Sequence, residues 1–177
     1  MDASRLFLID KVEGYSMEFS RLVAMLRFTR ITTLDEVRGL SIEQLDFRYE
    51  ESANSIGMLL SHIAAIEKAY QIETFEGRYL TEEEIDSLNP ALQLGPEARI
   101  YRDKPFEAYL KELEKARDKT LETFATLPDS WLYEQSMFWG GKPGNNYFKW
   151  FHVLEDELNH RGQIRILKKM YNLQSTM

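Results

Sequence analysis

Apolar residues recur with the spacing of one helical face in four long stretches of the chain. In residues 16–37 they fall three or four positions apart, and Gly39 follows as a stop signal; these apolar positions are Phe19, Leu22, Val23, Met25, Leu26 and Phe28. The same spacing recurs in residues 52–75, 106–127 and 146–171. Because side chains at this spacing share one face of an α-helix, the pattern predicts four long helices.

Turn and capping residues fill the segments between the predicted helices. Thr81–Glu84 has the form of a capping box and predicts a short helix. The Asn89-Pro90 and Gly95-Pro96 pairs confine that helix to the connection between the second and third long helices. No segment shows the sustained alternation of a β-strand. The sequence therefore predicts an all-α four-helix bundle with a long connection between helices 2 and 3.

The segment between the third and fourth long helices, residues 129–146, is rich in aromatic residues and contains the Gly140-Gly141 pair. We expect it to lie over a pocket. Its aromatic side chains and those at the start of the fourth helix would either line a pocket mouth or a dimer face, or fill the core. Core filling is the more common use of such rings; the group consists of Trp131, Trp139, Tyr147, Trp150 and Phe151.

Composition limits the class of protein. At 177 residues the chain is long enough for one domain, residues 1–177, with a single core. The absence of cysteine excludes disulfides, thiolate metal ligands and a cysteine nucleophile, and fits a cytoplasmic protein. A net charge of -7 opposes binding to nucleic acid. No stretch approaches the roughly 20 apolar residues that span a membrane, and residues 1–6 lack the basic start of a signal peptide.

The chain has three histidines, at positions 62, 152 and 160. Asp156 and His160 lie four residues apart on the fourth predicted helix, so both side chains can bind one ion while the backbone keeps its hydrogen bonds. The helix face that carries Asp156 and His160 also carries apolar residues, so we expect both side chains to point toward the bundle interior. His62 lies among apolar residues of the second helix. A divalent metal bound by His62, Asp156 and His160 would offset the cost of burying these groups.

The pattern alone leaves other interpretations of these residues open. A single histidine is more often a hydrogen-bonded core residue than a metal ligand, and Asp156 and His160 would also pair along one helix without a metal. His152 lies about 80° around the helix from His160, so we expect it outside the ligand set, either supporting a ligand or facing solvent. Gly162 either permits close approach of a helix or ligand, or is simply tolerated.

Two segments of the chain, Asn54–His62 and His160–Ile164, resemble the bacterial DinB superfamily, including its YfiT-like members. The similarity covers most of the chain. It implies a four-helix bundle, often a homodimer, in which His62 on the second helix and Asp156 and His160 on the last hold a divalent metal. Many relatives have histidine at the position of Asp156, whereas mycothiol-dependent isomerases have a carboxylate there. The identity of the metal, with zinc and nickel favoured, therefore stays open.

The same resemblance implies a reaction class. Characterised relatives are thiol-dependent transferases or isomerases that use mycothiol, bacillithiol or glutathione, and many members have no known activity. A divalent metal with open positions lowers the pKa of a bound thiol, so we expect a thiol S-transferase that acts on a small electrophile. The alternative is a non-enzymatic dimeric bundle with a structural metal or none, which serves as a small-ligand binding or interaction module. A metal site closed by His152 would favour this alternative.

Overall fold

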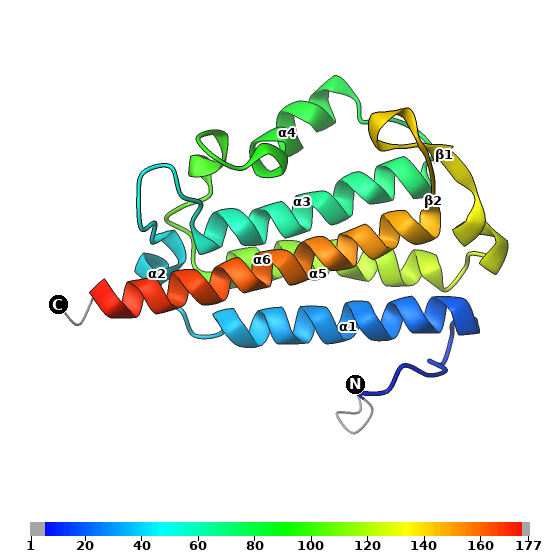
Figure 1. Ribbon diagram of the computed structural model, residues 1–177, viewed down its shortest axis with the longest axis horizontal. Coiled ribbons are helices and arrows are strands. Elements are labelled where there is room, and N and C mark those ends of the chain that lie inside the picture. The colour runs from blue at the N-terminus through cyan, green and yellow to red at the C-terminus, as the bar shows by residue number, and fades with distance from the viewer. Residues whose placement is uncertain (1–5, 175–177) are drawn as a thin grey trace.

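Four long helices form the body of the computed structural model, which describes residues 6–174 (Figure 1). They are α1 (Met17–Val37), α3 (Ile56–Phe75), α5 (Phe106–Phe124) and α6 (Asn146–Gln174). Helix α3 packs on α5 and α6, and α1 packs on α6. The predicted helical bundle is therefore confirmed. Residues 1–5, most of the segment in which we saw no signal-peptide character, lie outside the described range.

Side-chain caps explain where two of these helices begin. The hydroxyl of Ser16 accepts a hydrogen bond from the backbone N–H of Phe19 at the start of α1. The hydroxyl of Ser55 accepts one from the backbone N–H of Met58 at the start of α3. The apolar pattern suggested that this helix begins at residue 52. Because the capping residue Ser55 has extended backbone angles, α3 instead begins at Ile56.

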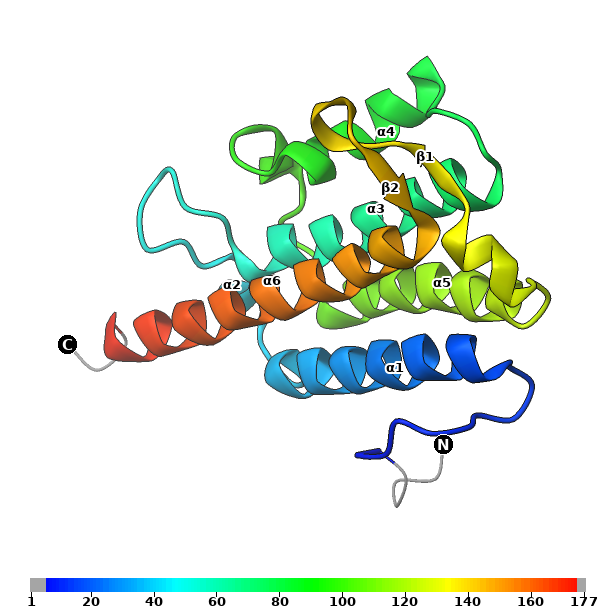
Figure 2. The same ribbon diagram turned by 45° about the vertical axis from the view of Figure 1, so that its right-hand side comes forward.

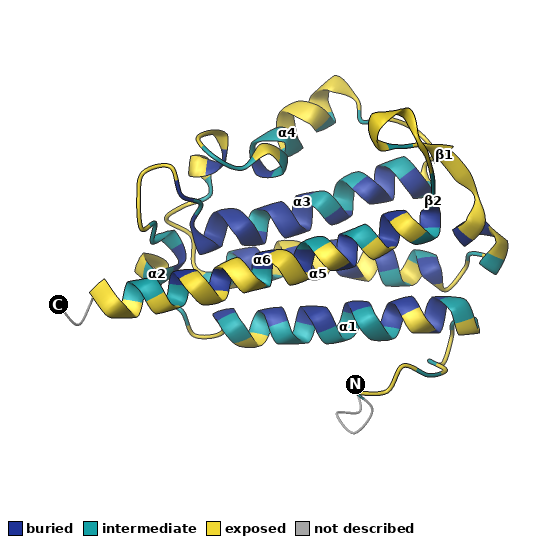
Figure 3. Cartoon of the chain, viewed as in Figure 1, coloured by how far each residue is buried: buried dark blue, intermediate teal, exposed yellow. Residues whose placement is uncertain are grey.

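Apolar side chains between the helices form two adjoining core clusters. The first gathers around Phe19, Phe124 and Trp150, and the second around Leu59 and Ile164. Helix α3 is buried on most sides, whereas α6 keeps an exposed stripe (Figure 3). Burial of these apolar surfaces supplies the main driving force for folding. Within the described range, no helix has both the length and the apolar composition needed to cross a membrane.

Four charged side chains, one from each long helix, meet inside the bundle; we call them the buried ion cluster. Arg30 of α1 donates hydrogen bonds to Glu67 of α3 and Glu157 of α6 at 2.8 to 3.1 Å. Arg117 of α5 donates to the same two carboxylates at 2.7 and 3.0 Å. All four side chains are buried. Burial opposes ionisation of Glu67, but Arg117 and Arg30 outweigh it and hold the pKa of this carboxyl below its ordinary value.

The described connections contain two further α-helices, α2 (Ile42–Asp46) before α3 and α4 (Glu82–Gln93) after it. The predicted capping box is present, because Thr81 and Glu84 each bond the other's backbone N–H through a side-chain oxygen. Helix α4 ends at Gln93, before the Gly95-Pro96 pair, and so stays within the connection as expected, but it continues through Pro90, so the expectation that the Asn89-Pro90 pair would also limit it is wrong. A proline removes one backbone hydrogen bond, and α4 tolerates this loss because most of the helix is accessible to water.

A small β-hairpin lies within residues 129–146, the segment that the sequence predicted to be an aromatic loop. Strand β1 (Gln135–Met137) pairs antiparallel with β2 (Pro143–Asn145), with Ser136 opposite Gly144. The expectation of no strand is wrong here, because strands of three residues are too short to show alternation. Figures 1 and 2 show the hairpin and α4 on the same side of the bundle, next to α3 and α6.

Two helical glycines are expected to respond in opposite ways to substitution by alanine. A Cβ atom at Gly57 would lie 2.5 Å from the hydroxyl oxygen of Tyr109, so Gly57→Ala should cost about 1–3 kcal/mol by overpacking. A Cβ atom at Gly162 would meet nothing within 4 Å, so Gly162→Ala should stabilise the helix by roughly 0.5–1 kcal/mol. Urea denaturation measures both effects. Lower stability of Gly162→Ala would contradict the expectation that an added methyl group at this position meets no neighbouring atom.

Candidate metal centre

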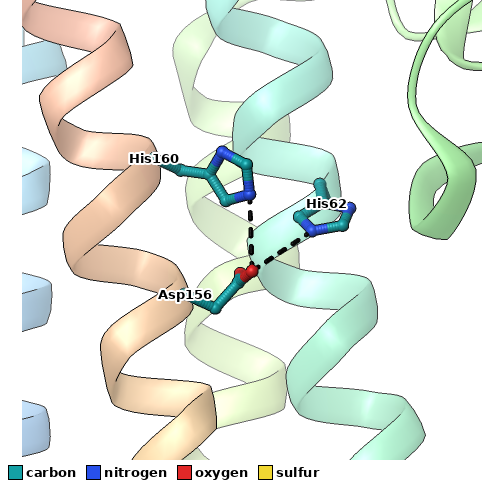
Figure 4. A group of neighbouring side chains, drawn as sticks. All are labelled: His62, Asp156 and His160. Atoms are coloured by element: carbon teal, nitrogen blue, oxygen red, sulfur yellow. Dashed lines mark ion pairs between the residues drawn. The ribbon is translucent and has the colours of Figure 1, made fainter.

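His62, Asp156 and His160 meet between α3 and α6 (Figure 4). His62 lies on α3, and Asp156 and His160 lie one turn apart on α6. Oδ1 of Asp156 is 3.5 Å from Nε2 of His62 and 3.4 Å from Nε2 of His160. Both imidazoles are buried, and Asp156 is partly buried. The structure therefore brings together the three residues that the sequence singled out, with ligand atoms that all lie within 4.8 Å of one another.

Hydrogen bonds at the outer side of each ring fix which nitrogen faces the centre. Nδ1 of His62 lies 2.8 Å from the carbonyl oxygen of Ala91 in α4. A carbonyl oxygen only accepts hydrogen bonds, so this nitrogen carries the proton. Nδ1 of His160 lies 3.3 Å from Oε1 of Gln163, which also accepts. Each neutral ring therefore presents its unprotonated Nε2, the form that binds a metal, toward Asp156.

The two distances from Asp156 to the imidazoles are long for direct hydrogen bonds and close to the ligand spacing around a metal ion. The two nitrogen–oxygen distances, 3.4 and 3.5 Å, exceed the roughly 2.7–3.2 Å of an N–H···O hydrogen bond. Ligand atoms placed about 2.0–2.1 Å from a tetrahedral zinc ion lie about 3.3 Å from one another, close to these distances. Oδ2 of Asp156 is buried, and none of residues 6–174 forms a hydrogen bond with it. A cation bound beside this carboxylate would reduce the cost of burying it.

Electrostatic interactions keep a negative charge at the centre. Burial opposes ionisation of Asp156, but the interactions with His160 and His62 outweigh it and hold the pKa of this carboxyl well below its usual range. Burial also opposes protonation of His160, but the interaction with Asp156 is stronger and raises the pKa of this imidazole above its ordinary value. The carboxylate of Asp156 therefore attracts a positive charge, which is either a proton on His160 or a divalent metal that His62, Asp156 and His160 could hold when both imidazoles are neutral.

Sequence comparison places the chain in a family. The profile of the mycothiol-S-transferase family matches residues 21–172, a range that includes all three residues of the centre. The chain belongs to the mycothiol-S-transferase family. This family is of the DinB and YfiT-like type, so the resemblance seen in the sequence is confirmed. A comparison with curated proteins finds no significant match.

A solved structure shares the fold of this mycothiol-S-transferase family member. It is the crystal structure of a Streptococcus pneumoniae protein determined by a structural genomics consortium. The two chains superpose with a TM-score of 0.65, and the match covers 94% of this chain and 96% of the other. At 14% sequence identity, this similarity supports the fold alone.

His152 lies outside the group of three. Its Nδ1 atom is 3.1 Å from Oε2 of Glu155 on the same helix. Its ring packs edge-on against Trp139, with ring centroids 4.6 Å apart, and against Tyr70, with centroids 5.8 Å apart. His152 is thus part of an aromatic cluster beside the centre, and it does not belong to the group that could hold a metal.

Substituting His152 by alanine should leave the metal content of the protein near that of wild type. The reason is that neither Glu155 nor the two aromatic rings around His152 belong to the group of three. Elemental analysis of the purified variant, after loading with zinc or nickel, measures the metal content. Loss of the metal would move His152 into the ligand set and contradict the assignment.

The two groups that orient the imidazoles were not found from the sequence. The Ala91 carbonyl belongs to the backbone, and no residue type signals which backbone acceptor a histidine will meet. Gln163 follows His160 by three residues, a spacing at which helical side chains touch, so the pattern contained this contact. The role of Gln163 depends on the direction in which the imidazole of His160 points, and the packing of α3 on α6 sets that direction.

Proposed function

We propose that this protein is a metal-dependent S-transferase that joins mycothiol to small electrophiles. The group of His62, Asp156 and His160, in a chain of the mycothiol-S-transferase family, carries the proposal. In the reaction the thiol sulfur forms a bond to an electrophilic carbon, the leaving group departs with the electron pair of the broken bond, and the thiol proton passes to solvent. The chain has no cysteine, so the sulfur comes from the thiol substrate.

Each residue of the proposed centre has a distinct role. Asp156 supplies the negative charge that retains a dication, and the Ala91 carbonyl and Gln163 hold the two imidazoles with Nε2 turned inward. Two imidazoles and one carboxylate suit zinc or nickel, and three protein ligands are the usual number in catalytic zinc sites. A metal bound there would lower the pKa of a coordinated thiol, so that the nucleophilic thiolate forms at neutral pH.

A transfer assay tests the proposal. Metal-loaded protein is incubated with mycothiol and 1-chloro-2,4-dinitrobenzene, and the thioether product is followed by absorbance; bacillithiol and glutathione serve as alternative thiols. We expect product formation that scales with metal occupancy, stops after chelation and returns on metal addition. A fully loaded protein that forms no product above the uncatalysed rate with any of the three thiols would contradict the proposal and favour a non-enzymatic binding module.

We further propose that the protein works as a homodimer in the cytoplasm. The family resemblance supports the dimer, and the absence of cysteine fits a reducing compartment. Sedimentation velocity of the purified protein tests the dimer. A mass of two chains is expected at micromolar concentration, and a mass of one chain would contradict the proposal.

A further inference from the structure

The aromatic residues around the hairpin and the start of α6 divide into two sets. Trp131 and Trp150 are buried and fill the core, as expected for most of this group. Trp139 and Phe151 instead keep 61% and 47% of their surface exposed. Phe151 lies on α6, where it begins a longer exposed face of the helix.

An apolar stripe follows Phe151 along the outside of α6; we call it the outer stripe. At about 100° per residue, its positions fall within an arc of about 80° around the helix. Its four large apolar side chains are 37% to 66% exposed. Exposed apolar surface of this kind marks a contact with another molecule. The outer stripe consists of Phe151, Glu155, Leu158, Gly162, Ile166, Lys169 and Leu173.

The neighbouring sides of α6 are already covered by the bundle. On one side α1 meets the helix, where Oε1 and Oε2 of Glu36 lie 2.7 Å from Nε of Arg165 and 3.0 Å from Nζ of Lys168. On another side α3 meets it at the candidate metal centre. Figures 1 and 2 show α6 on the near side of the bundle, between α1 and α3. The outer stripe lies between these two contacts and faces solvent.

The outer stripe is complementary to itself about Gly162. Leu158 and Ile166 each lie four residues from this glycine, and Glu155 and Lys169 each lie seven residues from it. If two copies of α6 cross antiparallel on a two-fold axis at Gly162, residues at equal distances from it face each other. Leu158 then packs on the partner's Ile166, and Glu155 meets the partner's Lys169.

The end of the stripe and its charges support the same alignment. Phe151 and Leu173 each lie eleven residues from the midpoint, so in this arrangement they also face each other. The side chain of Glu155 is 48% exposed, and Lys169 is exposed as well. A parallel pairing in register would instead place Glu155 against the partner's Glu155, and like charges repel. The charge pattern therefore favours a second, antiparallel copy of this helix as the occupant of the stripe.

We propose that two copies of the protein dimerise through the outer stripe of α6, antiparallel and with Gly162 at the two-fold axis. This inference rests on the proposed homodimer and assigns its interface. The contact spans residues 151–173, about 33 Å of helix. Its apolar pairs supply affinity, and its two symmetry-related pairs of Glu155 and Lys169 fix the alignment of the helices.

A single introduced cysteine tests the alignment, because the chain has no cysteine of its own. Gly162→Cys would place one thiol of each copy at the two-fold axis, within reach of a disulfide. After mild oxidation we expect most of this variant to migrate as a covalent dimer on a non-reducing gel. The control Ser87→Cys, at an exposed position of α4, should remain a single chain. Equal crosslinking of the two variants would overturn the inference.

Sedimentation velocity over a range of concentrations tests the interface itself. Ile166→Lys should weaken the dimer at least 100-fold, because the two-fold axis buries the new charge twice. The control Ile85→Lys changes an isoleucine of α4 that is also exposed, at 45%, and it should dimerise like wild type. Circular dichroism should show the same helix content in each variant.

A charge reversal tests which residues face each other. Lys169→Glu should weaken the dimer about tenfold, because it places two carboxylates opposite each other at both ends of the contact. Adding Glu155→Lys to this variant should restore the wild-type affinity. Failure of the double variant to recover would overturn the antiparallel alignment.

The sedimentation results separate this inference from the proposed function. A dimer that Ile166→Lys leaves intact would overturn the outer stripe as the interface and leave the proposed homodimer standing. A wild type that stays a single chain would contradict both. Neither experiment depends on thiol transfer, so the interface is tested separately from the proposed reaction.

Discussion

Replacing Glu157 by alanine is expected to lower the free energy of unfolding by about 3–5 kcal/mol. Glu157 is 1% exposed and accepts hydrogen bonds from both Arg30 and Arg117. Without it, two buried guanidinium groups share the single carboxylate of Glu67, and one buried positive charge has no partner. Urea denaturation at neutral pH measures the loss.

The matched control is Glu112→Ala, which also removes one carboxylate from an ion pair. Glu112 pairs with Lys68 at 2.6 Å, but its side chain is 51% exposed. Water replaces a lost partner at such a position, so the variant should lose less than about 1 kcal/mol. Losses of similar size in the two variants would mean that the buried ion cluster contributes no more than a surface pair, and that our account of the bundle interior is wrong.

Replacing His160 by alanine is expected to remove both metal binding and thiol transfer while leaving a folded helical protein. The variant keeps the core clusters and the buried ion cluster, and it loses one of the three proposed ligands. We expect the metal affinity to fall by more than about 100-fold, which exceeds the effect of losing an outer hydrogen-bond partner of a ligand. Competition with a chromogenic chelator measures the affinity, and circular dichroism reports the fold.

Gln163→Ala provides the graded control for this experiment. Gln163 only holds the ring of His160 in place, so its loss should weaken metal binding by about 10- to 100-fold without abolishing it. The account requires the order wild type, Gln163→Ala, His160→Ala in decreasing affinity. Wild-type affinity in His160→Ala would contradict the assignment of His160 as a ligand.

The sequence predicted those elements of the fold whose residue pattern repeats along a single helix. Three- and four-residue spacing located all four long helices, because burial of one face imposes that period directly on the residue types. The hairpin was missed because three residues per strand carry no period. The start of α3 was misplaced because Ser52 and Ser55 are both plausible caps in the sequence, and the hydrogen bond from Met58 selects Ser55.

The candidate site was predictable for the same reason, and the buried ion cluster was not. Asp156 and His160 lie on one helix at a spacing that the sequence displays, and His62 was the only histidine on another helix available to join them. In contrast, the buried ion cluster takes one residue from each of four helices, and its existence depends on how these helices are aligned with one another. Residue patterns within a single helix do not contain this alignment.

Elemental analysis of protein purified without an affinity tag, beside the His62→Ala variant, tests most directly whether the centre holds a metal. His62 is the one proposed ligand on α3, so the variant separates a shared site from simple pairing of Asp156 with His160 along α6. The account predicts about one divalent zinc or nickel ion per wild-type chain and none in His62→Ala. No bound metal in the wild type, or equal metal in both proteins, would contradict it.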